Sequence, residues 1–335
     1  MTEFENLHYE NVSFENGDHY LGEHSNSKFN GHGTYTYRGG ANFTGKFMNS
    51  LPNGPGRFKS GRDPKPQGEF VGEYSNGQKH GWGVYSWPNG SEYSGNFKHD
   101  AKHGFGEYLS NDSKYIGTYT NDAKDGYGEL VHKNGDKYSG EFKDGKKNGF
   151  GTYVYHKTQD VYIGMFWNNK KNGHGKYTWE NGDVYIGQYS NGFRDGRGEY
   201  VCDGGSNGVF GEERNSGKSG YRYIGEFREN SKHGFGEQYL IGNTQNRERE
   251  YIGRFARDKR HGVGTLVFDN KTCWLGRFEN GLPDGPGEFT YSNGSKRLGP
   301  LDVCHLDHDG QSAGSTKVQK ESGKDDELNK STEAL

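Results

Sequence analysis

The sequence predicts an all-β fold, an elongated single-layer array of about eleven stacked β-hairpins. A unit of the form ring-x-Gly-x-ring, then Gly-x-Gly, recurs eleven times, and the first glycine of Gly-x-Gly always follows the opening ring by eleven residues. Residues typical of tight turns separate the two halves. Self-similarity at a period of roughly 23 residues is the signature of a repeat array, in which each unit is stable only when stacked on its neighbours.

The opening rings are Tyr20, Phe43, Phe70, Tyr93, Tyr115, Tyr138, Tyr162, Tyr185, Tyr223, Tyr251 and Trp274. The matching glycines are Gly31, Gly54, Gly81, Gly104, Gly126, Gly149, Gly173, Gly196, Gly234, Gly262 and Gly285.

Each half of the repeat has the period of a short strand. Large and small residues alternate in the first half, and a second ring stands four residues after the first in every repeat except the first, which has His24. Strict alternation indicates a strand with one packed face. Between the halves lie runs such as Ser75–Lys79 (SNGQK), and Asn-Gly pairs such as Asn89-Gly90 often precede the next ring. These residues suit hairpin loops, so each repeat is predicted to be one hairpin.

The repeated glycines have a predicted packing role. A glycine inside a strand leaves room for a large neighbour to lie flat across it. We therefore expect both glycines of each Gly-x-Gly to lie under a ring, so that a valine at Gly149, for example, would collide with one.

The repeat pattern divides the chain into a cap at 1–19, an array at 20–299 and a polar tail at 300–335 that is predicted to be disordered. Insertions near 59–67, 203–222 and 240–250 all fall in the second turn of a repeat, so we expect them on one edge. Within the second insertion, Gly217-Lys218-Ser219 resembles a phosphate-binding loop, but the required upstream glycine is out of register. A surface loop, with partner contact as the alternative, is the prediction there.

Composition narrows the functional classes. Only 28% of residues are hydrophobic and mean hydropathy is −1.16, but 15% are aromatic and 57 are glycine, both at fixed phase. The net charge of −3 gives no field for nucleic acid. The three cysteines are widely spaced without a CxxC, so neither a disulfide framework nor a zinc site is expected. No signal-like segment opens the chain and no run of apolar residues would span a membrane, so a cytoplasmic protein is predicted.

This pattern resembles the MORN repeat (membrane occupation and recognition nexus). The segments Tyr138–Tyr155 (YSGEFKDGKKNGFGTYVY) and Tyr185–Tyr200 (YIGQYSNGFRDGRGEY) match its consensus closely, and the resemblance covers about 20–295. Similar repeats occur in membrane tethers, plant lipid kinases, a histone methyltransferase, cytoskeletal scaffolds and the radial-spoke heads of cilia. No kinase, SET-type or transmembrane segment stands beside the repeats here, so the resemblance points to the repeat-only scaffolds.

A row of cations stands nine residues after the opening ring in repeats three to ten. Its members, the basic row, are Lys79, Lys102, Lys124, Lys147, Lys171, Arg194, Lys232 and Arg260. Such a row could meet anionic headgroups. Alternatively, lysine simply suits an exposed turn and protects the edge from association. We favour this second interpretation because the chain is acidic overall.

A second set of rings is predicted to point away from the packed side. It occupies the position between the two glycines in five repeats and consists of Trp82, Phe105, Tyr127, Phe150 and Phe235. Isoleucines after the opening ring share this face: Ile116, Ile163, Ile186, Ile224 and Ile252. An exposed apolar patch of this kind would suit a partner helix or strand. The alternatives are a local mini-core and pairing with a second copy, a homodimer.

No catalytic, cofactor or metal site is predicted. The histidines and carboxylates occupy positions generated by the repeat, without the spacing of a triad or a carboxylate pair. His305–Asp309 (HLDHD) has no second set of ligands to complete a metal site. The first hypothesis is a non-enzymatic scaffold that binds and spaces protein partners in a cytoskeletal or ciliary (axonemal) assembly. The alternatives are a peripheral membrane tether that binds anionic phospholipids through the basic row, and a subunit that positions a separate enzyme.

Overall fold

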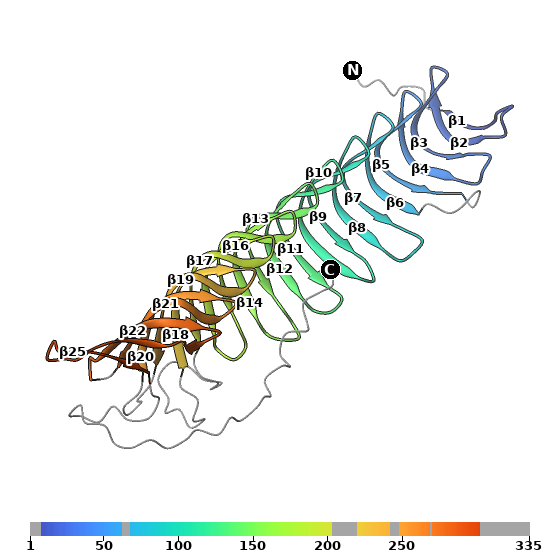
Figure 1. Ribbon diagram of the computed structural model, residues 1–335. Helices are drawn as coiled ribbons and strands as arrows, with labels where there is room; N and C mark the ends of the chain where they lie inside the picture. Colours follow the sequence, from blue (N-terminus) through green and yellow to red (C-terminus); the bar gives the residue numbers. More distant parts are fainter. Residues whose placement is uncertain (1–7, 62–67, 203–219, 242–247, 269, 302–335) are drawn as a thin grey trace.

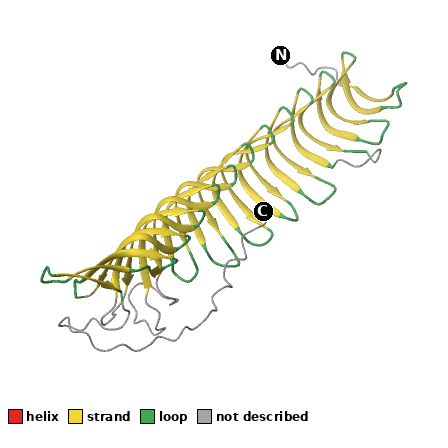
Figure 2. Cartoon of the chain, in the orientation of Figure 1, coloured by secondary structure: helices red, strands yellow, loops and turns green. Residues whose placement is uncertain are grey.

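The chain folds as one long sheet. The computed structural model describes residues 8–61, 68–202, 220–241, 248–268 and 270–301. Within these ranges it contains 25 strands in a single open antiparallel sheet and no helix (Figures 1 and 2). The strands run across the long axis and curve, so the sheet is a trough (Figure 1). The predicted all-β, single-layer array is confirmed.

The strands are β1 (His8–Ser13), β2 (His19–Ser25), β3 (Lys28–Thr36), β4 (Asn42–Met48), β5 (Leu51–Lys59), β6 (Glu69–Ser75), β7 (Gln78–Ser86), β8 (Glu92–Lys98), β9 (Ala101–Leu109), β10 (Ser113–Thr120), β11 (Ala123–His132), β12 (Lys137–Lys143), β13 (Lys146–Val154), β14 (Val161–Trp167), β15 (Lys170–Thr178), β16 (Val184–Ser190), β17 (Phe193–Cys202), β18 (Gly220–Arg228), β19 (Ser231–Ile241), β20 (Glu248–Ala256), β21 (Lys259–Phe268), β22 (Cys273–Glu279), β23 (Leu282–Pro283), β24 (Pro286–Thr290) and β25 (Lys296–Pro300).

Each repeat is one hairpin whose register aligns its glycines. In the hairpin of β12 and β13, Gly140 lies opposite Gly151, and the register then shifts by a bulge before the loop. Asp144-Gly145 forms this loop with φ of 48° and 78°. Two successive positive φ values fit a type I′ turn, whose twist matches that of the strands. Strands β13 and β14 then pair in the same way, so the hairpins form a continuous ladder.

The core is a ladder of rings packed on glycines. Tyr138 is fully buried, and its ring lies over Gly151 so closely that a methyl group there would sit 2.5 Å from the ring. Phe142 and Phe166 meet it edge-on, with ring centroids 5.1 and 5.0 Å away. The Tyr138 hydroxyl donates a hydrogen bond to the Glu141 carbonyl at 2.8 Å. Because Phe166 belongs to the next repeat, each opening ring also joins adjacent hairpins.

The glycine prediction is half wrong. The second glycine of Gly-x-Gly, such as Gly151, does lie under a ring. The first does not: Gly149 has φ of 89°, and a Cβ there would meet the Glu141 side chain rather than a ring. The bulge in each hairpin turns the backbone at this position into the left-handed region, which favours glycine for its conformation.

The two faces of the sheet differ in burial. On one face the opening rings are 0–2% exposed although no second layer covers them. The curvature of the strands therefore encloses them, and we call this the inner face. The opposite, outer face carries large side chains that are about half exposed, including all five rings predicted there.

Hydrogen bonds to an aspartate, which we did not predict from the sequence, fix the second turn of several repeats. Asp136, two residues before an opening ring, accepts hydrogen bonds from the Tyr153 hydroxyl at 2.9 Å and the His156 amide at 2.8 Å. Asp18, Asp160 and Asp183 bind the corresponding tyrosine hydroxyls. Each of these second turns is thus attached to the second strand of the next repeat.

A further strand lies beyond the hairpins at each end of the array. Strand β1 pairs with β2, and β25 pairs with β24. Strand β1 belongs to the segment 1–19 that we interpreted as a cap, whereas β25 lies at the end of the predicted array. Most of the predicted insertions (62–67, 203–219 and 242–247) and the tail from 302 onward, with the Gly217–Ser219 and His305–Asp309 motifs, lie outside the described residues.

Candidate partner-binding surface

Four of the five predicted outer rings form one row on consecutive repeats. Trp82, Phe105, Tyr127 and Phe150 occupy β7, β9, β11 and β13, and are 52%, 54%, 65% and 54% exposed. We call these four residues the ring stripe. Phe235 is equally exposed on β19, but His174 and Arg197 occupy the same position in the two repeats between it and Phe150. It is therefore separate from the stripe.

The stripe is an extended row and not a cluster. Adjacent strands lie about 4.8 Å apart, so rings on every second strand are about 9.6 Å apart and the stripe is about 29 Å long. Polar residues occupy the strands between: Asn96 opposite Trp82, Thr118 opposite Phe105 and Glu141 opposite Tyr127. In the described part of the chain no ring contact joins members of the stripe to one another. These rings therefore do not form the mini-core that was one alternative.

The intervening polar side chains hold the backbone of the stripe in place. The Glu141 carboxylate accepts a hydrogen bond from the Phe150 amide at 3.0 Å. The Asn96 side chain donates to the Phe105 carbonyl at 3.3 Å. Thr118 donates its one hydroxyl proton to the Asp125 carbonyl. The backbones of Phe105 and Phe150 are thus fixed by a neighbouring strand before any partner binds.

Two carboxylates lie in the same row as the rings of the stripe. Glu73 lies next to Gly81, the residue before Trp82, and Glu141 lies between Tyr127 and Phe150. Neither carboxylate forms an ion pair in the described residues. In the adjacent row, the carboxylates are paired, with Lys114 to Glu107 at 2.7 Å and Lys137 to Glu129 at 2.8 Å. No cation occurs in the stripe's own row between Glu73 and Phe150.

The predicted aliphatic residues extend this apolar surface. Ile163, Ile186 and Ile224 are 41%, 52% and 37% exposed, and Val71 at the other end is 48% exposed. Polar residues replace the aliphatic residue in two repeats of the stripe, as at Ser139. The most continuous set of exposed large side chains in this region is therefore the ring stripe itself.

We expected the basic row to lie on exposed turns. It lies instead on the inner face, over the ring core. Lys147, for example, stands opposite Phe142 inside β13 and is partly buried. Each of the eight cations has a ring centroid 4.5–5.4 Å away. At this range the ring faces attract the cations. The sequence did not indicate these contacts because the partners come from different repeats.

Lys171 has the most enclosed position in the row. Its ammonium group lies 4.6–5.9 Å from the centroids of Tyr155, Tyr162, Tyr177 and Tyr189. Burial, with a smaller contribution from Arg194, lowers the pKa of Lys171 to about 8. Within the described residues, none of the six lysines of the row forms an ion pair. Their charges are offset by rings of the same chain.

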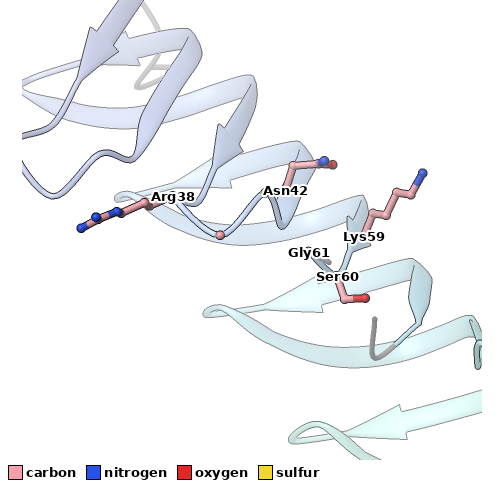
Figure 3. Close-up of a pocket in the computed structure, with 7 residues that line it drawn as sticks. Arg38, Asn42, Lys59, Ser60 and Gly61 are labelled. Atoms are coloured by element: carbon pink, nitrogen blue, oxygen red, sulfur yellow. The ribbon is translucent and has the colours of Figure 1, made fainter. Parts of the chain in front are cut away.

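The structure offers little for catalysis or metal binding. A shallow recess of about 480 Å³ lies between second turns and is lined by Arg38, Gly39, Gly40, Asn42, Lys59, Ser60 and Gly61. The side chains of Arg38 and Lys59 point away from each other (Figure 3), so they do not converge on a ligand. Among the described residues no three metal-ligating side chains gather, and no helix could cross a membrane.

Comparison with known proteins identifies the repeat. The MORN repeat family matches residues 20–41, 43–61, 70–92, 93–113, 115–137, 138–157, 162–184, 185–207, 223–240, 251–273 and 275–296. No curated protein sequence matches the chain significantly.

A solved structure with some likeness is the TCP domain of SAS-4 (dCPAP) of Drosophila melanogaster in complex with a proline-rich motif of Ana2 (dSTIL). It is 11% identical, with 65% of this chain and 83% of that chain covered and a TM-score of 0.22, a likeness too weak to inform fold or function. The eleven family matches coincide with the eleven hairpins and cover most of the sheet, so this chain belongs to the MORN repeat family.

Proposed function

We propose that this protein is a non-enzymatic scaffold that binds protein partners through the ring stripe and spaces them along its length. The exposure of four rings on one row of the outer face carries this proposal. Each ring would bury about 100 Å² more on binding, so the stripe offers about 400 Å². That area is comparable to the largest apolar patch of a typical monomer and is about half of one side of a standard interface.

By its resemblance to repeat-only members, we place this scaffold in a cytoskeletal or ciliary assembly of the cytoplasm. A rigid array with one repeat every 9.6 Å or so can hold partners at fixed separations. MORN repeats are in general binding repeats for proteins and membranes and are not catalytic. The proposal therefore needs no active site.

The membrane-tether alternative is less well supported. It requires the basic row to reach lipid headgroups, whereas these cations are partly buried against rings on the inner face. Moving these cations from the inner face to lipid headgroups would break their cation–π contacts. A homodimer through the outer face would use the same stripe. The mass of the purified protein in solution distinguishes a homodimer from a monomer that binds a different protein.

The test is capture of partners by variants. Changing Trp82, Phe105 and Phe150 together to Ser should abolish partner capture while circular dichroism stays unchanged, because interface aromatics typically contribute about 2 kcal/mol or more each. Trp167→Ser is the matched control, since Trp167 is 59% exposed but lies outside the stripe. Pelleting with phosphoinositide vesicles runs in parallel. If the triple variant keeps its partners, or if vesicle binding alone directs the protein to its cellular location, the scaffold proposal fails.

A further inference from the structure

The spacing of the ring stripe restricts which backbone can lie along it. Its rings repeat at about 9.4–9.8 Å, twice the distance between strands. A bound β-strand presents the same face every 6.4–6.8 Å or so and falls out of step after one ring. An α-helix with a heptad repeat presents a residue about every 10.5 Å, a mismatch of about 3 Å over the stripe. A polyproline II helix has three residues per turn and repeats at about 9.3 Å, which stays within about 1 Å over three intervals.

The stripe also carries hydrogen-bond donors that an α-helix would not use. The Trp82 indole N–H and the Tyr127 hydroxyl have no hydrogen-bond partner among the described residues, and both rings are more than half exposed. An α-helix satisfies its own carbonyl groups. A polyproline II helix has no internal hydrogen bonds, so its carbonyl groups accept donors from a binding surface. Aromatic rings with a polar edge are the usual contact for such ligands.

Charge further specifies the ligand. Glu73 and Glu141 flank and interrupt the row without cationic partners in the described residues, and no lysine or arginine occurs between them in that row. A ligand lying along the stripe would pass both carboxylates. Positions three apart lie on one side of a polyproline II helix. Long cationic side chains at every third residue would therefore lie beside the prolines that face the rings, and would reach these two carboxylates from the edge of the row.

From these observations we propose that the ring stripe binds a proline-rich, basic segment of a partner in the polyproline II conformation. The segment lies along the array, with one helical turn per repeat. Prolines pack between Trp82, Phe105 and Tyr127, over Asn96 and Thr118, and the segment then crosses Glu141 to reach Phe150. This inference rests on the proposed function, because it names the class of partner for the same surface.

Binding of synthetic peptides tests the inference. We would measure fluorescence anisotropy of a labelled peptide of four Pro-Pro-Arg triplets with the full chain. A basic α-helical peptide with leucine at every seventh position is the comparison. We expect saturable binding of the triplet peptide and at least tenfold weaker binding to Phe105→Ser and Tyr127→Ser, since each loses a central ring. Glu73→Gln should weaken binding severalfold, and Trp167→Ser should leave it unchanged.

The possible failures are distinguishable. If the helical peptide binds through the stripe and the triplet peptide does not, the occupant is a helix and the inference is overturned. Equal binding of the triplet peptide to wild type and to both ring variants shows only general charge attraction and also overturns it. If the triple Ser variant loses its cellular partners but the triplet peptide never binds, the scaffold function stands without this inference. If the triplet peptide binds the stripe but the triple Ser variant keeps its cellular partners, the peptide site is supported and the scaffold function is refuted.

Discussion

Replacing Gly151 with alanine tests the ring-and-glycine core directly. The new methyl group would lie 2.5 Å from a carbon of the Tyr138 ring and 2.6 Å from its hydroxyl oxygen. The ring would have to retreat by about 1 Å to reach an ordinary contact distance, yet Phe142 and Phe166 stand against it at about 5 Å. Overpacking of this kind costs about 1–3 kcal/mol.

Two further terms nearly offset each other. Movement of the ring endangers the hydrogen bond from the Tyr138 hydroxyl to the Glu141 carbonyl, worth about 1 kcal/mol. Alanine in a strand, on the other hand, gains about 0.5–1 kcal/mol over glycine, and Gly151 has no positive φ that would penalise the change. The net destabilisation is therefore about 1–3 kcal/mol.

Hydrogen exchange followed by mass spectrometry is the appropriate assay, because a long repeat array need not unfold in one step. Faster exchange should concentrate in β12, β13 and β14, which pack around Tyr138. Gly39→Ala is the control, since Gly39 has open space around it and no positive φ, and it should change little. Gly149→Ala should cost about 1–2 kcal/mol through its positive φ, and its methyl group would also displace the Glu141 side chain. If Gly151→Ala exchanges like Gly39→Ala, or if exchange rises uniformly along the array, the packing account is wrong.

The fold was predictable because the repeat itself encodes it. The ring-x-Gly-x-ring alternation predicts the strands, and turn residues such as Asp144-Gly145 predict the loops. The different roles of the two glycines were not predictable, because the pattern shows only that both are invariant in the repeat. The bulge between Gly140 and Phe142 gives the two glycines of the partner strand their different roles. A bulge depends on how two strands pair rather than on either strand alone.

The candidate site was predictable in part for the same reason. Alternation places Phe105 and Phe150 on the outer face, where the structure finds them half exposed. The position of Lys147 was misjudged because a lysine near a turn normally points into solvent, whereas here the curvature of the sheet folds it over Tyr153 and Tyr138. The spacing of the stripe also needed the strand pairing, since a sequence gives residue separations and not distances between strands.

Two further predictions concern the inner face. Tyr119 is 3% exposed and its hydroxyl has no hydrogen-bond partner among the described residues. Tyr119→Phe should therefore leave stability unchanged or raise it by about 1 kcal/mol, as measured by thermal unfolding. A clear loss of stability would mean that the hydroxyl has a partner in solution. Lys171 predicts a pH dependence. Burial lowers the pKa of Lys171 from its ordinary value of 10.5 to about 8, so between these values the unfolded chain holds more protons and stability should rise with pH. Denaturant unfolding is best compared at pH 7, 8 and about 9, because exposed tyrosines ionise around pH 10 and this ionisation on unfolding opposes the rise at higher pH. The free energy of unfolding of Lys171→Met should rise less over this pH window than that of wild type. Lys143→Met removes an exposed lysine of β12, so its free energy of unfolding should rise as much as that of wild type. Equal slopes for wild type and Lys171→Met would show that the ring cage holds the ammonium form as firmly as water does, and that its enclosure carries no penalty.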